Sequence, residues 1–472
     1  MHKYKVADLH CHPNLKTFGH SFSGNDKGKY DPCHVWFYDP PNAFTKTLNS
    51  FTGLTKFRQA DFTSMFKGGV RIAVVSFYPF EKGFFISGNW SGPISARIAS
   101  LVTGIGYKRV RYLQEHKDYF ADLTSEYEFF SGSCNQYNID GEIRKWKFAR
   151  SWDEVENILL SDDTIAVIPS IEGAHVLNTG LSLYGRSLTE DEVMDNISNL
   201  KQWAYPPFFI TFAHNFNNDL CGHARSLERL GKMVDQFENL DGGFSPLGLR
   251  ALHLLLSGDN GSPIYIDIKH MSLKARLEYQ EIVKSDYKNQ IPIIVSHGAV
   301  TGTNIAGEQQ IPYSTFLFSK NDINFFDEEL ISIAKSGGAF ALQLDGNRLA
   351  SRKYLKKPLR KIFNGGGIAN SSYIIWTQLQ HMAEILDQQN LFGWGTMTIG
   401  SDFDGTINPL NGIWTAENFP ALADQLLIHA NHYLKKSNRL TLSENKSITA
   451  EEIVERFMFG NALSLLKNHY HK

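Results

Sequence analysis

The chain has 472 residues, and its 47 Lys and Arg residues against 49 Asp and Glu residues give a formal net charge of −2. This balance argues against a nucleic-acid partner, and a content of 42% hydrophobic and 13% aromatic residues argues against disorder. Four scattered cysteines, no apolar leader and no run of 18 apolar residues predict a cytoplasmic protein without a membrane anchor.

Short apolar runs rich in Val, Ile and Phe recur along the chain, and each has the length and continuous hydrophobicity of a buried parallel strand. The eight runs cover residues 5–9, 70–77, 164–171, 208–212, 263–268, 291–295, 339–344 and 397–399. Amphipathic, helical patterns lie between them, over 190–203, 247–256, 273–283, 327–334, 374–386 and 421–433. This alternation predicts an α/β fold of the (β/α)8 TIM barrel type, with an open, doubly wound sheet as the alternative.

The spacing of these runs is uneven. Between the second and third strands lie residues of about 80–163, far more than one crossover helix requires. No Pro/Gly/Ser-rich linker isolates this stretch, so we expect a long helical insertion over the barrel mouth within a single domain that spans 1–472. The basic run at 352–357 is expected to belong to a solvated surface loop after the seventh strand.

Polar residues follow the predicted strands at their C-terminal ends. His10 and His12 end the first strand, and because side chains alternate along a strand they point to the same side, as two ligands of one metal ion would. Five later strands end in a residue that can bind a metal ion or act as an acid or base. These residues are Glu172, His214, His270, His297 and Asp402. Barrel active sites form on this face, so the pattern predicts a metal-dependent site there.

Each residue alone has a simpler interpretation. A single histidine at a strand end is more often a hydrogen-bonded polar residue than a metal ligand, and an H-x-H pair is a common false positive. Glu172 could cap a helix, and Asp402 could form an Asx turn. The joint placement at six of eight strand ends favours the metal site. Cys11 is expected to pack away from its neighbouring histidines, and the roles of His175 and His223 stay open.

The motifs, taken together and in chain order, resemble the membrane (renal-type) dipeptidases of the amidohydrolase superfamily. The matching segments are Asp8 to Pro13, Lys67 to Val70, Ser170 to Gly173, Thr211 to Asn215, Asp267 to Ser272, Ile294 to His297, Ile399 to Gly405 and Gly460 to Leu463. The resemblance implies a metallopeptidase that hydrolyses a dipeptide or similar amide with two divalent metal ions, for which zinc is expected.

Carried over residue by residue, the resemblance makes His10 and His12 ligands of one ion and Glu172 the bridge between two ions. It makes His270 and His297 ligands of the second ion. His214 would orient the substrate, and Asp402 would be the catalytic acid and base.

The sequence departs from the family at two points. The family has aspartate at the position of His12, and imidazole suits zinc but lowers the negative charge of the site by one. The family also holds the substrate carboxylate with an arginine between the sixth and seventh strands, whereas residues 298–326 contain no arginine and only Lys320 as a basic residue. The identity of the substrate is therefore open.

Other functions fit parts of this pattern. A related amidohydrolase acting on another amide, a lactone or an N-acyl amino acid would use the same metals. A metal-dependent phosphoesterase should carry basic groups around the metals, and the strand ends offer only Lys269. A non-catalytic binding protein would hold no stoichiometric metal. We expect a small-molecule substrate, a possible homodimer, and neither a nucleic-acid nor a membrane partner.

Overall fold

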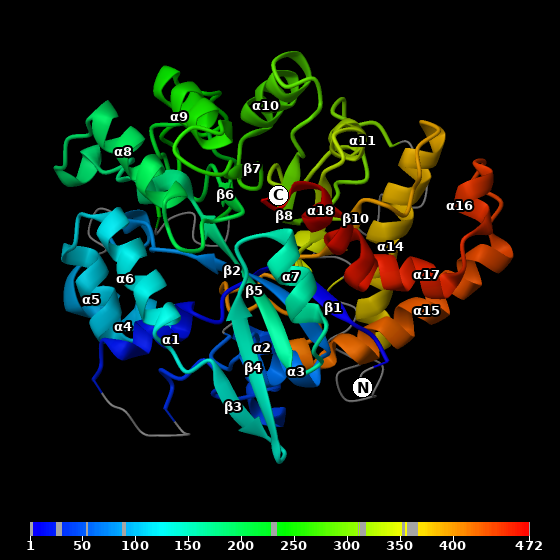
Figure 1. Cartoon of the computed structure of the whole chain (residues 1–472), viewed down its shortest axis with the longest axis horizontal. Helices are drawn as coiled ribbons and strands as arrows, with labels where there is room; N and C mark the ends of the chain where they lie inside the picture. Colours follow the sequence, from blue (N-terminus) through cyan, green and yellow to red (C-terminus); the bar gives the residue numbers. More distant parts are fainter. Residues whose placement is uncertain are drawn as a thin grey trace.

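Eight parallel strands close into a barrel at the centre of the molecule (Figure 1). The structure is a computed structural model that describes residues 3–24, 31–52, 55–86, 91–227, 234–309, 311, 318–351, 355 and 367–471. In order around the barrel the strands are β1 (Val6–Cys11), β2 (Val70–Phe77), β5 (Thr164–Glu172), β6 (Phe209–Thr211), β7 (Tyr265–Asp267), β8 (Ile294–Gly298), β9 (Ala339–Leu342) and β10 (Met397–Ile399). Pairing of β10 with β1 closes the ring, which confirms the predicted barrel and excludes the open sheet.

The amphipathic stretches form helices outside the barrel. The six predicted helices are α8 (Glu190–Lys201), α9 (Pro246–Leu256), α10 (Leu273–Ser285), α11 (Asp327–Lys335), α14 (Gly367–Gln388) and α15 (Phe419–Lys436). The side chains of Thr189, Ser245 and Ser272 cap the first three helices by accepting a hydrogen bond from a backbone N–H three residues on. Apolar residues of the helices and of the outward strand faces form the largest buried cluster, so the core encircles the barrel.

A second apolar cluster fills the interior of the barrel. Alternate strand residues, such as Leu9 and Val74, point inward and meet the C-terminal helix α18 (Asn461–His469), which follows α16 (Ser443–Ser447) and α17 (Ala450–Glu455). Tyr470, just after α18, is fully buried and donates a hydrogen bond to the carbonyl of Ala149. Apolar side chains therefore close the N-terminal end of the barrel, and the polar residues gather at the other end.

The described part of the segment between β1 and β2 carries helices that the sequence patterns did not predict, α1 (Leu15–Ser21), α2 (Ala43–Thr52) and α3 (Phe62–Lys67). A buried ion pair, with 2.7 Å between Lys16 Nζ and Asp404 Oδ1, fixes this segment to the loop after β10. Lys16 also donates to the carbonyls of Thr55 and Phe57. Hydrophobic periodicity gives no signal for a fully buried lysine, which explains why the sequence patterns did not predict this helical segment.

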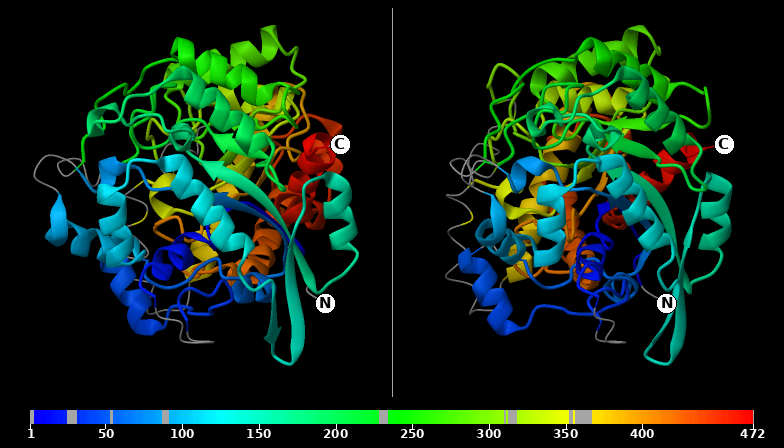
Figure 2. Two further views of the ribbon diagram at one scale, coloured as in Figure 1. Left: turned by 60° about the vertical axis from the view of Figure 1, so that its left-hand side comes forward. Right: turned by 90° about the vertical axis from the view of Figure 1, so that its left-hand side faces the viewer.

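In its described residues, the predicted insertion after β2 contains the α-helices α4 (Gly92–Thr103), α5 (Tyr107–Glu115), α6 (Tyr119–Ser131) and α7 (Trp152–Leu159), besides the short 3-10 helix η2 (Lys82–Phe84). It also contains a hairpin, β3 (Gln136–Ile139) and β4 (Glu142–Phe148), that projects from the body of the molecule (Figure 2). Asp140 and Gly141 form its two-residue turn with φ of 53° and 93°, as a type I′ turn requires. The Asp-Gly dipeptide was the sequence signal for this departure from an all-helical insertion.

Two further sequence predictions concern exposure and membranes. Within the described ranges, no helix is both long and apolar enough to span a bilayer. The basic loop predicted at 352–357 lies, apart from Leu355, outside the described residues.

Candidate active site

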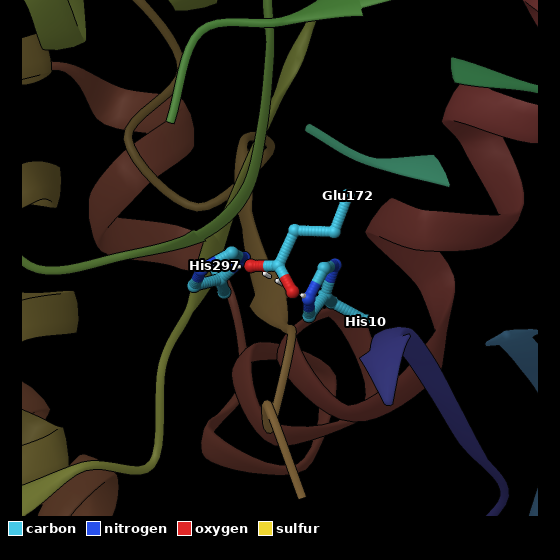
Figure 3. Close-up of side chains that lie close together, drawn as sticks. All are labelled: His10, Glu172 and His297. Atoms are coloured by element: carbon cyan, nitrogen blue, oxygen red, sulfur yellow. Dashed lines mark ion pairs between the residues drawn. The ribbon is translucent and has the colours of Figure 1, made fainter. Parts of the chain in front are cut away.

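The seven side chains singled out by the sequence lie together at the C-terminal end of the barrel strands, and each is at most 6% exposed. The Glu172 carboxylate, at the end of β5, lies among the imidazoles. Its Oε1 is 3.6 Å from His10 Nε2 and 3.4 Å from His297 Nε2 (Figure 3). Three separate strands thus direct one carboxylate and two imidazoles to a common point.

One part of the site is built on β1 and the loop after β10. The Nε2 atoms of His10 and His12 are 3.1 Å apart, as the alternation of side chains along β1 predicts. Asp402 Oδ1 lies 3.4 Å from His12 Nε2 and 3.9 Å from His10 Nε2. His10, His12 and Asp402 therefore offer three ligand atoms close enough to hold one metal ion.

The other part is built on the ends of β6, β7 and β8. His270 Nε2 lies 3.3 Å from His297 Nε2 and 3.7 Å from Glu172 Oε1. His214 Nε2 is 3.3 Å from the same Glu172 oxygen. Glu172, His214 and His270 form a second group with ligand atoms close enough for a metal ion, and His10, Glu172 and His297 form a third. Glu172 belongs to two of these groups and so stands between the two parts.

The donor set fits a divalent metal ion. Imidazole nitrogens and carboxylate oxygens are the ligands that zinc takes in catalytic sites. Among the described residues, the Nδ1 atoms of His10 and His270 are buried without a hydrogen-bond partner, while their Nε2 atoms face the cluster. A cation bound among these Nε2 atoms and the carboxylate would accept their lone pairs, so the cluster can bind metal.

The electrostatics of the cluster agree with that role. Burial lowers the pKa of His270 and of His297 well below the ordinary value, so both are neutral bases with a free lone pair. Burial also opposes charge on His12, but hydrogen bonds with Asp402 and Glu172 outweigh it and raise the pKa of His12 to about 10. Against burial, the charges of His214 and His10 hold the pKa of Glu172 well below its usual range. His12 is therefore held in its protonated form, and a metal ion that bound there would displace this proton.

Two buried aspartates fix the strand ends beneath the cluster. The Asp8 carboxylate accepts hydrogen bonds from the backbone N–H of His10 at 3.2 Å and of Ser401 at 2.8 Å. Asp267 repeats this arrangement with the N–H groups of Lys269 at 3.0 Å and Ser296 at 2.9 Å. Asp8 therefore holds the backbone of β1 to the loop that follows β10.

Two functional candidates that the sequence did not indicate come from the second and seventh strands. Gln343, just after β9, donates from Nε2 to Asp402 Oδ2 at 2.7 Å. Glu81, four residues after β2, accepts from His214 Nδ1 at 2.6 Å. Burial would raise the pKa of Glu81, but the charge of His214 outweighs it and lowers that pKa to about 2. Their only sequence signal was their position shortly after a strand.

Two residues of the cluster have backbone conformations that only their surroundings can enforce. Asp402 and His270 have φ of 57° and 67°, in the left-handed region that non-glycine residues seldom adopt. A Cβ on Gly405 would lie 1.9 Å from Asp402 Oδ1, so only glycine leaves room for this carboxylate. Strain of this kind is typical of functional sites.

Other polar residues near the motifs do not join the cluster. His175 Nε2 bonds to the carbonyl of Pro79, and the ring nitrogens of His223 bond to the carbonyls of Ala224 and Glu238. Cys11 packs in the outer core, with its Sγ directed to the carbonyl of Val74, as strand alternation predicts. Asp404, two residues after Asp402, points to Lys16 instead.

No protein-family model matches the sequence, and no curated protein matches it. Solved structures match over the whole length. The chain is similar to dipeptidase AC, a metallopeptidase of family M19, with 15% identity, a TM-score of 0.53 and 99% of each chain covered. It is also similar to a metallopeptidase from Rhodobacter sphaeroides liganded with a phosphinate mimic of the dipeptide L-Ala-D-Ala, with 15% identity, a TM-score of 0.51 and 99% of each chain covered. The chain has the fold of these metallopeptidases. This likeness agrees with the fold that the sequence resemblance implied.

Proposed function

We propose that this chain is a binuclear metal-dependent hydrolase that cleaves the amide bond of a dipeptide or a similarly small substrate. One observation carries the proposal. The carboxylate of Glu172 lies 3.3–3.7 Å from the Nε2 atoms of five histidines, and all of these side chains are buried at the end of the barrel where active sites form. The fold shared with dipeptidase and metallopeptidase structures and the resemblance of the motifs support the same conclusion.

Following the motif resemblance, we assign the residues to two ions, for which we propose zinc. His10 and His12 would hold one ion near Asp402, His270 and His297, whose Nε2 atoms are 3.3 Å apart, would hold the other, and Glu172 would bridge them. Ions bound there would supply Lewis acidity and lower the pKa of a bound water toward about 7.

Asp402 is placed to move the proton. Gln343 holds its Oδ2, which leaves Oδ1 facing the histidines, and this oxygen can take a proton from the attacking water and pass it to the leaving amine. The strained backbone at Asp402 and the absence of a side chain at Gly405 keep the carboxylate in this position.

His214 is placed to stabilise negative charge. Burial opposes its protonation, but the charges of Glu81 and Glu172 outweigh burial and raise the pKa of His214 to about 10. Because Glu81 accepts from Nδ1, the protonated ring can present Nε2–H to the carbonyl oxygen on which charge develops. Glu81 therefore acts through His214 as a positioning residue.

The first experiment measures metal per chain on purified protein, together with hydrolysis of L,L and L,D dipeptides by the same sample. We expect about two zinc ions and amide cleavage. Asp402→Asn should keep the metal and lose nearly all turnover, whereas the exposed control Asp424→Asn should change neither. An active Asp402→Asn protein would remove the proposed proton shuttle, and a protein that binds no metal after reconstitution would refute the hydrolase.

Two further expectations accompany this proposal. All four cysteines are free thiols, which agrees with a reducing compartment. The cytoplasmic location and the homodimer stay predictions, to be checked by fractionation and by size-exclusion chromatography with light scattering.

A further inference from the structure

Lys269 is a fully buried lysine with an open hydrogen-bonding position at its Nζ. Its side chain is 0% exposed, and within the described part of the chain its Nζ has no hydrogen-bond partner. The other buried lysines, Lys16, Lys82 and Lys201, all donate from Nζ to carbonyl oxygens. A buried ammonium without a partner is costly, so Lys269 indicates a ligand that completes the site.

The position of Lys269 places that ligand at the candidate active site. Lys269 comes two residues after Asp267, whose carboxylate bonds to Thr211 and Ser296 inside the barrel, and residues two apart share a face. The next residue is His270, a proposed metal ligand. Asp402 and Asp267 are the carboxylates whose charges act on Lys269, and within the described residues neither accepts a hydrogen bond from its Nζ.

A second cation lies beside Lys269. Arg348, in the short helix α12 (Gly346–Leu349) after β9, is half-buried and donates from Nη2 to the carbonyl of Ser226 at 2.7 Å. After burial, the charge of Arg348 is the main cause of a lowered pKa for Lys269, and it also acts on His270. The charge of Arg348 therefore acts on both residues, and it adds to the positive charge that a protonated Lys269 brings to this side of the site.

We propose that Lys269, with Arg348 beside it, binds a carboxylate of the substrate. This inference rests on the proposed hydrolase function and names the class of its substrate: a dipeptide or N-acyl amino acid whose carboxylate is free. One ammonium and a guanidinium already held by Ser226 suit a monoanion better than a phosphate dianion, which needs more donors. Residues 298–326 offer no competing cation except Lys320, which is exposed.

The test uses zinc-loaded protein and two matched probes, a phosphinate mimic of the dipeptide L-Ala-D-Ala with a free carboxylate and the same compound as a carboxamide. Isothermal titration gives the Kd of each probe for the parent protein, Lys269→Met, Arg348→Gln and the control Lys201→Met. Lys201 is a buried lysine at the end of α8 whose Nζ donates to the carbonyls of Ser257 and Asp259. Zinc content and melting temperature are measured for every variant.

We expect the parent protein to bind the carboxylate probe more tightly than the carboxamide. Lys269→Met should weaken the carboxylate probe roughly 10- to 100-fold and leave the carboxamide unchanged, as loss of a charge-assisted hydrogen bond implies. Arg348→Gln should have a smaller effect in the same direction, and Lys201→Met none. If Lys269→Met fails to fold, the binding of the two probes to the parent protein and to Arg348→Gln still tests the inference.

Several results would overturn the inference. These are equal binding of the two probes by the parent protein, no binding of either probe, an equal loss for both probes in Lys269→Met, or tighter binding of inorganic phosphate than of the carboxylate probe. Failure of the proposed function is separable, because binding is measured without turnover. Hydrolysis of Ala-Ala and of its amide with equal kcat/KM would support the hydrolase function and refute the carboxylate site. Carboxylate-dependent binding without hydrolysis would support the carboxylate site and refute the hydrolase function.

Discussion

Replacing Glu81 by glutamine tests whether a residue outside the sequence motifs controls the active site. The Glu81 carboxylate accepts from His214 Nδ1 at 2.6 Å and Tyr78 Oη at 2.9 Å with one oxygen, and from the backbone N–H of Asn215 and Phe216 with the other. Glutamine keeps the shape, but its amide nitrogen cannot accept, so one pair of donors loses its partner. This loss should lower the free energy of unfolding by roughly 1–3 kcal/mol for each buried donor left unpaired.

The catalytic consequence follows from the charge. Burial lowers the pKa of His214, whereas the charges of Glu81 and Glu172 raise it to about 10. In Glu81→Gln only the charge of Glu172 still counteracts burial, so the pKa of His214 should fall. A histidine cation is lost as pH rises through its pKa, and the basic limb of the kcat profile should therefore move to lower pH. Loss of a charged donor to the developing oxyanion should reduce kcat roughly 10²- to 10³-fold.

The assay is the pH dependence of kcat for dipeptide hydrolysis, measured at equal metal content. The matched control is Glu126→Gln, which alters another fully buried glutamate of the same insertion that bonds to Asn14 and the N–H of Tyr78. The control should keep the basic limb in place. A Glu81→Gln enzyme with an unchanged basic limb and a kcat within a few-fold of the parent would refute the role assigned to the pair.

Three further predictions concern metal binding and stability. Zinc binding near pH 7 should release about one proton from His12, so the affinity for zinc should rise with pH. In calorimetry the binding enthalpy should then depend on the ionisation enthalpy of the buffer. A binding enthalpy that is the same in all buffers would contradict this prediction. Asp404→Ala should lower the free energy of unfolding, measured in urea, by about 3–5 kcal/mol, because the charge of the buried Lys16 would lose its carboxylate partner. The exposed control Glu281→Ala should lower it by less than about 0.5 kcal/mol. Gly405→Ala should displace Asp402 and reduce kcat while metal content, measured by mass spectrometry, is retained.

The sequence by itself determined the barrel and the set of polar residues that gather at its mouth. A buried parallel strand is apolar on both faces, so each of the eight strands appears as a continuous apolar run, and its end is marked by the first polar residue. His10 and His12 could be assigned to one side from the two-residue period of β1 alone. The hairpin at Asp140 was also encoded locally, in a turn dipeptide that has a known conformation.

Only the tertiary structure decided which residues support those groups. Glu81 lies 133 positions from His214 and Gln343 lies 59 positions from Asp402, and each pair meets because closure of the barrel brings distant strand ends together. That Lys269 Nζ has no hydrogen-bond partner among the described residues likewise depends on everything packed around it. Local patterns report the environment of one segment, whereas a hydrogen bond, a shifted pKa or an unpaired charge is a property of atoms from several segments in one place.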